Sequence, residues 1–304
     1  MDEKQKNDDK QQQVEWSFSF EQLGEQIADF FRGLGAKGEE DVKLSNFSEP
    51  MGGATSARVR LDLAAGETTI DTLDPASDLL LEAQITHIGE IKFASSGETE
   101  KVVSLSQSAD AGEWFRHVFA FIGTGQRLRW NVSLTPSIPV DLAVNGGVGR
   151  SVFNLSALKT QAITINGGAG EVILTLPAAQ TYRAAVNGGV GRSDIIVPAD
   201  ATVEMALRMG TGEINLDIGE GAAVTATING GVGALNLRLP AGAAARIEGK
   251  AGIGDMSVPA HFVRLSGGGD FLSQSGVWQT ADYETAERRI NIRYEGGIGA
   301  LNVR

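Results

Sequence analysis

Glycine recurs at a constant interval of 21 residues through the middle of this chain, and this spacing constrains the fold more than any other feature. The glycines are Gly149, Gly170, Gly191, Gly212, Gly233 and Gly254. Between them apolar and polar residues alternate at period two, which is the pattern of half-buried β-strands. A repeat of this length is too short for most paired-helix repeats, so each repeat must be one stacked coil of strands. We therefore predict an all-β fold, a single-stranded parallel β-helix (β-solenoid) with 21-residue coils and right-handed coiling.

The turns between strands carry residues that tolerate a positive φ angle. Asparagine precedes a Gly-Gly pair in four coils, at Asn145, Asn166, Asn187 and Asn229. Asn and Gly adopt positive φ at the least steric cost, so these positions mark the corners, and the first three asparagines are expected to form a side-chain ladder. The residue before the repeating glycine is apolar in most coils, and we expect it to point into the core. These residues are Val148, Ala169, Val190, Val232, Ile253 and Ile298.

The repeat extends beyond the regular run in both directions. Gly66 follows a strand-like segment, the stretch from Ile88 to Phe93 is typical of a degenerate coil, and Gly299 repeats the turn near the end. The 45 residues from Gly254 to Gly299 fit two lengthened coils, with Gly276 as the intermediate corner. We expect a disordered polar tail over 1–16, an amphipathic helix over 17–35, a linker over 36–54 and one β-solenoid domain over 55–304.

Two apolar clusters outside the repeat are candidate interaction surfaces. A capping-box pattern at Ser19 and Gln22 begins the helix predicted over 17–35, which either caps the open end of the solenoid or recruits a protein partner. The second cluster either packs against the side of the solenoid or, if exposed, forms a contact surface. The candidate residues are Leu23, Ile27, Phe30 and Phe31 in the first cluster, and Trp114, Phe115 and Phe119 in the second.

Charge and composition exclude several classes of function. The formal net charge of −12 opposes binding to nucleic acid or to an anionic membrane. The absence of cysteine removes thiol catalysis and thiolate metal sites. Neither a signal peptide nor an apolar run long enough to span a membrane occurs, so we expect a cytoplasmic protein for which peripheral membrane association stays open.

The residues just after the repeating glycine are the best place to look for chemistry. In chain order they are Arg150, Glu171, Arg192, Glu213, Ala234 and Asp255. Equivalent residues of adjacent coils lie about 4.8 Å apart, so this column predicts a ladder of surface ion pairs. Glu171 and Glu213, about 9.6 Å apart, lie near the upper limit of the inverting-glycosidase spacing, but Arg192 between them argues against that role. The histidines occupy unrelated positions, and no phosphate-binding glycine loop occurs. We therefore predict no enzymatic activity, no cofactor and no metal.

The stretch that begins at Ser133, SLTPSIPVDLAVNGGVGRSVFNLSALKTQAITINGGAGEVILTLP, and the closing RINIRYEGGIGALNVR resemble known families. They are similar to the bacterial toast-rack and putative-adhesin families of unknown function, and to the related C-terminal domain of LiaF-type cell-wall-antibiotic-response proteins. The resemblance covers most of residues 55–304. It implies a single-stranded β-helix, and it supplies no catalytic residues. Members tied to envelope-stress signalling usually carry transmembrane helices, and no such apolar run occurs in this sequence.

Three functional hypotheses follow. The first is a non-enzymatic scaffold or protein-interaction module, with a link to cell-envelope stress implied by the resemblance. The second is an adhesin-like carbohydrate-binding protein, which predicts exposed aromatic side chains along one flank. The third is a self-assembling solenoid, because the C-terminal residues Asn302 to Arg304 finish inside a strand whose edge would be free to pair with another chain.

Overall fold

The computed structural model describes residues 42–108, 128–270 and 273–304, and all regular elements in this part are β-strands. No helix long and apolar enough to cross a membrane is found among these residues. The expected polar tail, the expected helix over 17–35 with Leu23, Ile27, Phe30 and Phe31, and the cluster of Trp114, Phe115 and Phe119 lie outside the described residues.

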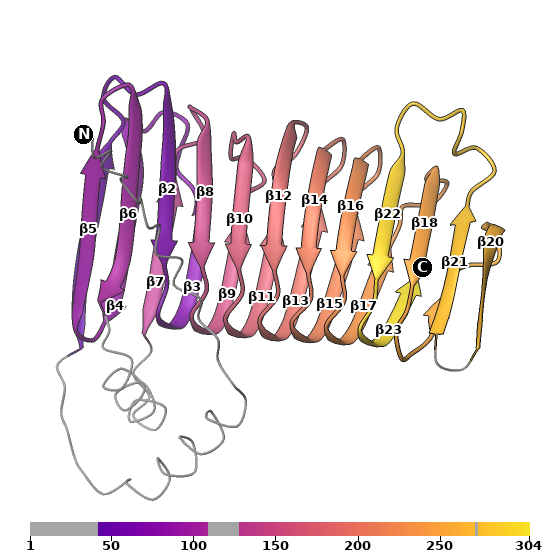
Figure 1. Cartoon of the computed structure of the whole chain (residues 1–304). Helices are drawn as coiled ribbons and strands as arrows, with labels where there is room; N and C mark the ends of the chain where they lie inside the picture. The colour runs from indigo at the N-terminus through magenta and orange to yellow at the C-terminus, as the bar shows by residue number, and fades with distance from the viewer. Residues whose placement is uncertain (1–41, 109–127, 271–272) are drawn as a thin grey trace, which may run out of the picture. The chain divides into compact units, whose positions relative to one another are not determined.

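The strands form two long sheets, here named sheet A and sheet B (Figure 1). In spatial order, the strands of sheet A are β1 (Lys43–Pro50), β4 (Leu79–His87), β7 (Arg129–Leu134), β3 (Ala65–Thr72), β9 (Val148–Asn154), β11 (Ala169–Thr175), β13 (Val190–Val197), β15 (Thr211–Ile218), β17 (Val232–Arg238), β23 (Ile298–Val303) and β19 (Met256–Ser257). In the same order, those of sheet B are β5 (Glu90–Ser96), β6 (Glu100–Ser108), β2 (Ser56–Asp62), β8 (Val140–Asn145), β10 (Ala162–Asn166), β12 (Thr181–Asn187), β14 (Thr202–Arg208), β16 (Ala223–Asn229), β22 (Ile290–Glu295), β18 (Ala245–Lys250), β21 (Ser273–Gln279) and β20 (Val263–Asp270).

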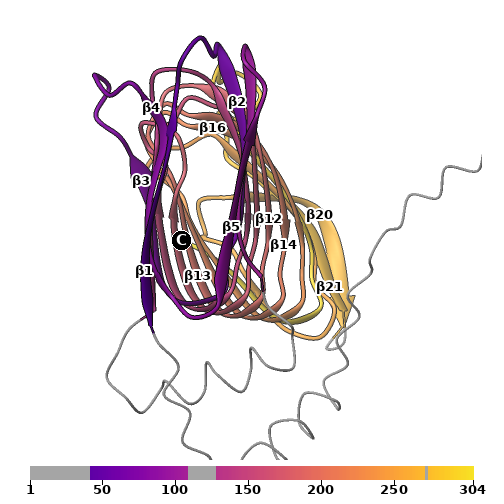
Figure 2. The same cartoon turned by 90° about the vertical axis from the view of Figure 1, so that its left-hand side faces the viewer.

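Each coil of the regular stack gives one strand to each sheet. The chain runs through β8 in sheet B, turns at two residues, runs through β9 in sheet A, and returns by a longer turn to β10. Strands of adjacent coils pair in parallel at an offset of 21 residues, which places Asn145 opposite Asn166 and Asn166 opposite Asn187. Viewed from the end, the two sheets form facing walls with the core between them (Figure 2).

Alternation along each strand builds that core. In β14, Val203, Met205 and Leu207 are buried between the sheets, whereas Glu204 and Ala206 face solvent. One cluster of buried side chains runs from β2 to β23 without interruption. Period-two alternation therefore buries one face of every coil against the other sheet, which confirms the predicted all-β solenoid class.

The spatial order of the coils departs from the chain order at both ends. At the C-terminal end, β22 and β23 lie between the coil of β16 and β17 and the coil of β18 and β19 (Figure 1). At the N-terminal end, β2 and β3 lie between the outer strands β6 and β7 and the coil of β8 and β9. The first and last coils of the chain are thus each enclosed by a coil on both sides.

This order corrects three expectations. The residues after Gly254 do not form two further coils, because β20 and β21 pair as an antiparallel hairpin in which Gly276 lies mid-strand. The segment from Ile88 to Phe93 leads from β4 into β5, and both strands run antiparallel to their neighbours instead of forming a coil. The C-terminal strand is not an edge, because β23 pairs with β17 on one side and with β19 on the other.

The expected linker over 36–54 also contains a strand. Strand β1 pairs antiparallel with β4 along its whole length and forms the edge of sheet A. The segment has no glycine turn of the repeat, and for that reason the repeat pattern did not reveal it. Its alternating side chains are only partly buried, and Phe47 packs against the core.

Candidate contact surfaces

The glycine turns connect sheet B to sheet A and stack directly on one another. Glycine φ angles in these turns lie between +115° at Gly66 and +147° at Gly254. A Cβ atom at Gly191 would overlap the carbonyl oxygen of Gly170, so neither the backbone angle nor the space admits a side chain. The predicted turn residues all lie on this corner of the stack: Asn145, Gly149, Asn166, Gly170, Asn187, Gly191, Gly212, Asn229, Gly233, Gly254 and Gly299.

Asparagine side chains line the sheet B side of these turns. The Asn166 Nδ2 group donates to Asn145 Oδ1 at 2.6 Å, and Asn187 Nδ2 donates to Asn166 Oδ1 at 2.6 Å. Asn145 in turn donates to the Asp62 carboxylate, and Arg208 Nη1 donates to Asn187 Oδ1 at 3.3 Å. The amides therefore bond along the stack, and each satisfies its neighbour's oxygen.

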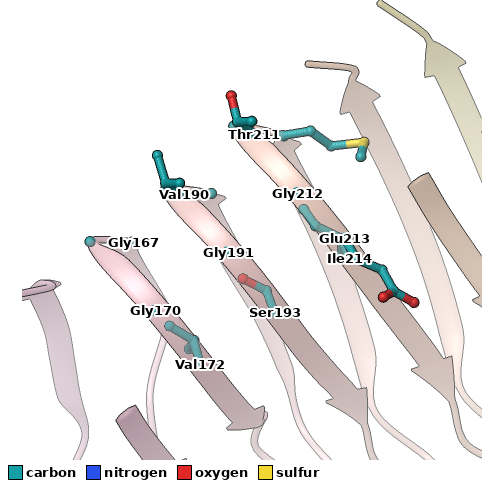
Figure 3. Close-up of a pocket in the computed structure, with 15 residues that line it drawn as sticks. Gly167, Gly170, Val172, Val190, Gly191, Ser193, Thr211, Gly212, Glu213 and Ile214 are labelled. Carbon is teal, nitrogen blue, oxygen red and sulfur yellow. The ribbon is translucent and has the colours of Figure 1, made fainter. Parts of the chain in front are cut away.

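The space beneath the turns is too small for an organic ligand. A cavity of about 20 Å³ is lined by the turn glycines together with Val172, Ser193 and Ile214 (Figure 3). A single water molecule needs about this volume. The turns are thus a packed corner and not a binding pocket.

A row of aliphatic side chains projects outward beside the turns, which corrects the expectation that they point into the core. The exposed fraction rises from 39% at Val148 to 48% at Val190 and 50% at Val232, and reaches 54% at Ile298 and 55% at Ile253. Figure 3 shows Val190 and Thr211 projecting at the starts of neighbouring strands. The following glycine turns the strand by its positive φ angle, so the core-facing positions of the strand begin two residues after that glycine, as at Ile214, Leu235 and Leu301. We call this set the aliphatic row. In spatial order it is Val148, Ala169, Val190, Thr211, Val232, Ile298 and Ile253.

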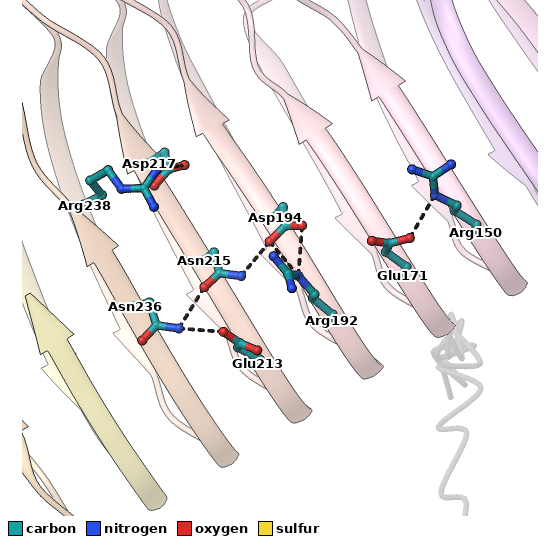
Figure 4. A network of polar contacts seen from close by, with 9 residues as sticks. All are labelled: Arg150, Glu171, Arg192, Asp194, Glu213, Asn215, Asp217, Asn236 and Arg238. Carbon is teal, nitrogen blue, oxygen red and sulfur yellow. Dashed lines mark hydrogen bonds and ion pairs between the residues drawn. The ribbon is translucent and has the colours of Figure 1, made fainter. Parts of the chain in front are cut away.

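Charged residues one step after the glycines alternate in sign along sheet A. Arg150 Nε and Glu171 Oε2 form an ion pair at 2.8 Å, as the predicted ladder requires (Figure 4). Arg192 departs from it, because its Nε donates to Asp194 of its own strand at 3.0 Å, and this hydrogen bond raises the pKa of Arg192. The ladder is longer than the chain order indicated. In spatial order it runs Arg129, Glu67, Arg150, Glu171, Arg192 and Glu213.

The two carboxylates considered for glycoside hydrolysis are held by neighbouring side chains. Glu171 pairs with Arg150, and Glu213 Oε1 accepts a hydrogen bond from Asn236 Nδ2 at 2.7 Å. The strand of Arg192 lies between their strands, in register with both. In addition, no group of three or more His, Asp or Glu side chains suited to a metal ion occurs among the described residues.

A second amide ladder, which we did not predict from the sequence, crosses sheet A. Asn215 Nδ2 donates to Asp194 Oδ1 at 2.6 Å, Asn236 Nδ2 to Asn215 Oδ1 at 2.8 Å, and Asn302 Nδ2 to Asn236 Oδ1 at 2.9 Å (Figure 4 shows the first two). Asn302 follows Asn236 in this ladder only because β23 is inserted next to β17. The repeated Asn at the third position after the glycine was the available signal.

A hollow lies on sheet B at the opposite corner from the glycine turns. Its volume is about 620 Å³, and its floor is formed by the starts of β12, β14 and β16. Arg183 and Glu204 project from this floor as an exposed ion pair at 3.2 Å, and Arg289 forms a wall. We call this hollow the sheet B groove.

The wall of the groove is held in place by arginine contacts. Arg288 Nη2 donates to the carbonyl oxygens of Asp200 at 2.9 Å and Ala201 at 3.2 Å, and its Nε donates to that of Gly221. Arg289 donates to the carbonyl oxygen of Ala286 at 2.7 Å and lies over the ring of Tyr283 at 5.5 Å. No sequence pattern indicated the groove, because residues 280–289 precede β22 without any repeat motif.

Comparison with known proteins gives a family match and two distant structural likenesses. The family model described as the N-terminal domain of toast_rack, DUF2154, matches residues 34–196, just over half of the 304 residues. No curated protein matches the chain. A solved structure described as a putative cell adhesion protein from Clostridium sporogenes has 15% identity and a TM-score of 0.36, with 86% of this chain and 99% of that chain covered. Another, described as a putative adhesin from Bacteroides fragilis, has 12% identity and a TM-score of 0.37, with 89% and 100% covered. Likenesses at this level carry no conclusion about function.

Proposed function

Because this chain belongs to the family described as the N-terminal domain of toast_rack, we propose that it is a non-enzymatic interaction module that holds a protein partner in its sheet B groove. The description of the family names no activity, so the proposal rests on this chain's own surface. A scaffold role in the cell-envelope stress response, which the sequence resemblance implies, would fit such a module.

The sheet B groove is the observation that carries the proposal. Preformed hollows of this size are the usual binding sites of folded proteins, and its wall is fixed by the contacts of Arg288 and Arg289. Arg183, Glu204 and Arg289 offer both signs of charge, and Thr181 and Thr202 add hydroxyl groups. Arginine is enriched among the residues that dominate protein–protein binding, and a mixed-charge groove suits a peptide segment that also carries both signs.

The carbohydrate-binding alternative receives less support from this surface. It predicts exposed aromatic rings against which sugars could stack. Tyr182, in the floor of the groove, and Tyr283, beneath Arg289, are both buried, and the exposed large hydrophobic residues of the described part of the chain are all aliphatic. Binding to glycans alone is therefore one of the results that would contradict the proposal in the experiment below.

Affinity capture with two matched arginine variants tests the proposal. Arg183→Glu reverses a charge in the groove, whereas Arg238→Glu reverses one on sheet A; both arginines are exposed and paired to a carboxylate of the preceding or following coil. A protein captured by the wild type and by Arg238→Glu, but lost with Arg183→Glu, supports the groove. Equal capture by all three, or binding only to immobilised glycans, contradicts it.

A further inference from the structure

The aliphatic row is an exposed apolar surface that the fold itself does not require. The stacked glycines fix the geometry of each turn, and the residue before them lies outside the core, so a polar side chain there would be accommodated equally well. The row nevertheless carries valine or isoleucine in five of seven coils. A continuous exposed row of this kind indicates a contact surface.

Two properties along this edge repeat every second coil. Apolar character alternates over Val148, Ala169, Val190, Thr211 and Val232, with valine in every second coil and the less apolar alanine or threonine between. Charge alternates in step in the neighbouring column, where the strands that begin with Val148 and Val190 carry arginine and those that begin with Ala169 and Thr211 carry glutamate. Both alternations have the same phase.

A shared two-coil period makes the edge complementary to itself. When two identical stacks meet about a two-fold axis that lies between adjacent coils, each odd coil faces an even coil of the copy. Valine then faces alanine or threonine, and arginine faces glutamate. We propose that this edge is the interface through which two copies of the chain associate, with the axis between β11 and β13.

That axis gives a specific set of contacts. Val190 faces Ala169 of the second copy, and Val148 faces its Thr211. In the charged column Arg192 faces Glu171, and Arg150 faces Glu213, so no like charges meet between these four strands. The axis also lies beside β11, the central strand of sheet A, so the two stacks overlap along nearly their full length.

The size of the row sets the strength to be expected. With the axis between β11 and β13, the row positions from Val148 to Thr211 face one another across three strand spacings, about 14 Å, whereas Val232 comes opposite the buried Ala65 of the copy. A strip this short and narrow buries less area than tight complexes do. The dimer should therefore be weak, with a dissociation constant on the order of 100 μM. Such an equilibrium escapes detection in dilute solution and becomes visible at high local concentration.

Cysteine cross-linking of the full chain tests both the interface and its axis, because the natural sequence contains no cysteine. Ala169→Cys and Val190→Cys are made separately, and a mixture of the two is oxidised. With the axis between β11 and β13, the two positions face each other, whereas each is displaced from its own copy by one strand spacing, which puts the Cα atoms beyond about 7 Å and outside disulfide range. Ala199→Cys, exposed at the opposite corner of the same coil, is the matched control.

The expected result is a disulfide-linked heterodimer in the mixture, formed at least about tenfold faster than dimers of any single variant. Sedimentation equilibrium should show self-association of the wild type up to about 1 mM, and Val190→Lys should abolish it. Two results overturn the proposal: cross-linking in the mixture no faster than with Ala199→Cys, or a wild type that stays monomeric over the whole concentration range. A faster reaction of Val190→Cys with itself than with Ala169→Cys would also overturn it, because it would place the axis on a coil.

Discussion

The two ends of the stack solve the same problem differently. At the N-terminal end both sheets continue into antiparallel strands, β4 and β1 in sheet A and β5 in sheet B. At the C-terminal end only sheet B continues, through β21 and β20, while sheet A stops at the two-residue strand β19. The core is therefore flanked by antiparallel strands of both sheets, here called two walls, at the N-terminal end, and by one wall, in sheet B, at the C-terminal end.

Side chains at the N-terminal end join its two walls. Phe47 of β1 and Phe93 of β5 approach with ring centroids 5.4 Å apart, across the gap between the sheets. Lys101 of β6 pairs with Glu49 of β1 in a largely buried ion pair. The C-terminal end has no such pair of aromatic rings among its described residues, and Arg264 instead covers Trp278 at 5.3 Å.

At both ends the terminal coil of the chain lies between two other coils. Each end therefore has two separate tasks, which are to enclose the terminal coil and to cover the core. Enclosing the terminal coil protects it from fraying, because its strands are paired on both sides. Closing the core is a separate task, which falls to the antiparallel strands. The N-terminal end does both fully, whereas the C-terminal end does the first fully and the second only in part.

The largest effect is expected from filling the glycine of an enclosed coil. Gly299 has φ +145°, and a Cβ atom there would overlap the carbonyl oxygen of Gly233; Gly66, with φ +115°, would overlap that of Leu128. Gly299→Ala and Gly66→Ala should each lower the free energy of unfolding by about 3 kcal/mol or more, since backbone must move. Gly242→Ala is the control, with φ +72° and open space, and should cost about 1 kcal/mol. Urea denaturation measures all three, and equal losses would show that the enclosed coils are not tightly stacked.

The spatial order of the coils at the two ends is also the part of the fold that we did not predict from the sequence. The period of 21 residues and the alternation within strands revealed the solenoid, its core positions and its turn residues, because these depend on local pattern. Which coil lies beside which depends on long-range pairing, and similar coils can stack in several orders at similar energy. Chain order was therefore the natural assumption, and it was wrong at both ends.

Equivalent side chains of successive coils could have indicated the spatial order of the coils. In chain order Glu67, Arg129 and Arg150 would place two arginines side by side, whereas the observed order restores the alternation. Likewise Asn302 extends the ladder of Asn236, where chain order would have placed Ser257. The aliphatic row was misjudged for a simpler reason, because apolar character was equated with burial. The sheet B groove lies among residues without a repeat, so no pattern pointed to it.

Breaking the aromatic contact should affect the N-terminal end alone. Phe47→Ala removes a partly buried ring that touches Phe93 and the core, and it should lower the free energy of unfolding by about 2 kcal/mol. Hydrogen exchange should accelerate in β1 and β5 together, although these strands belong to different sheets, and stay unchanged in β20 and β21. Phe47→Leu, which keeps most of the apolar contact, is the control. Acceleration confined to β1 would mean that the ring does not join the sheets.

Acid should also distinguish the ends. His87 is buried where β1 pairs with β4. Burial lowers the pKa of His87 from the ordinary 6.5, and the positive charge of Lys43 lowers it further. A hydrogen bond with the backbone at Ile88 raises the pKa and so opposes part of the shift. The unfolded chain therefore takes up a proton more readily than the folded chain. The free energy of unfolding should be independent of His87 above about pH 6.5 and fall as the pH drops below that value. Urea titrations from pH 7.5 to pH 5 should show a smaller fall for His87→Gln. His261→Gln, at an exposed position toward the other end, should behave as the wild type; equal pH profiles for all three would remove His87 as the cause.

The smallest change in stability should come from the edge of the half-closed end. Val263 and Leu265 are 55% and 54% exposed on β20, the edge strand of sheet B, whereas the opposite edges carry Lys43 on β1 and Lys92 on β5. An edge strand with exposed aliphatic residues can pair with another chain, and an added lysine opposes such pairing. Leu265→Lys should therefore change the free energy of unfolding by less than about 0.5 kcal/mol and reduce aggregation during prolonged incubation, followed by light scattering. Leu44→Lys on β1 is the matched substitution, since Leu44 is 60% exposed beside Lys43, and it should leave aggregation unchanged. If the two variants aggregate alike, the C-terminal edge is no more open than the N-terminal one, and the second wall at the N-terminal end serves the core alone.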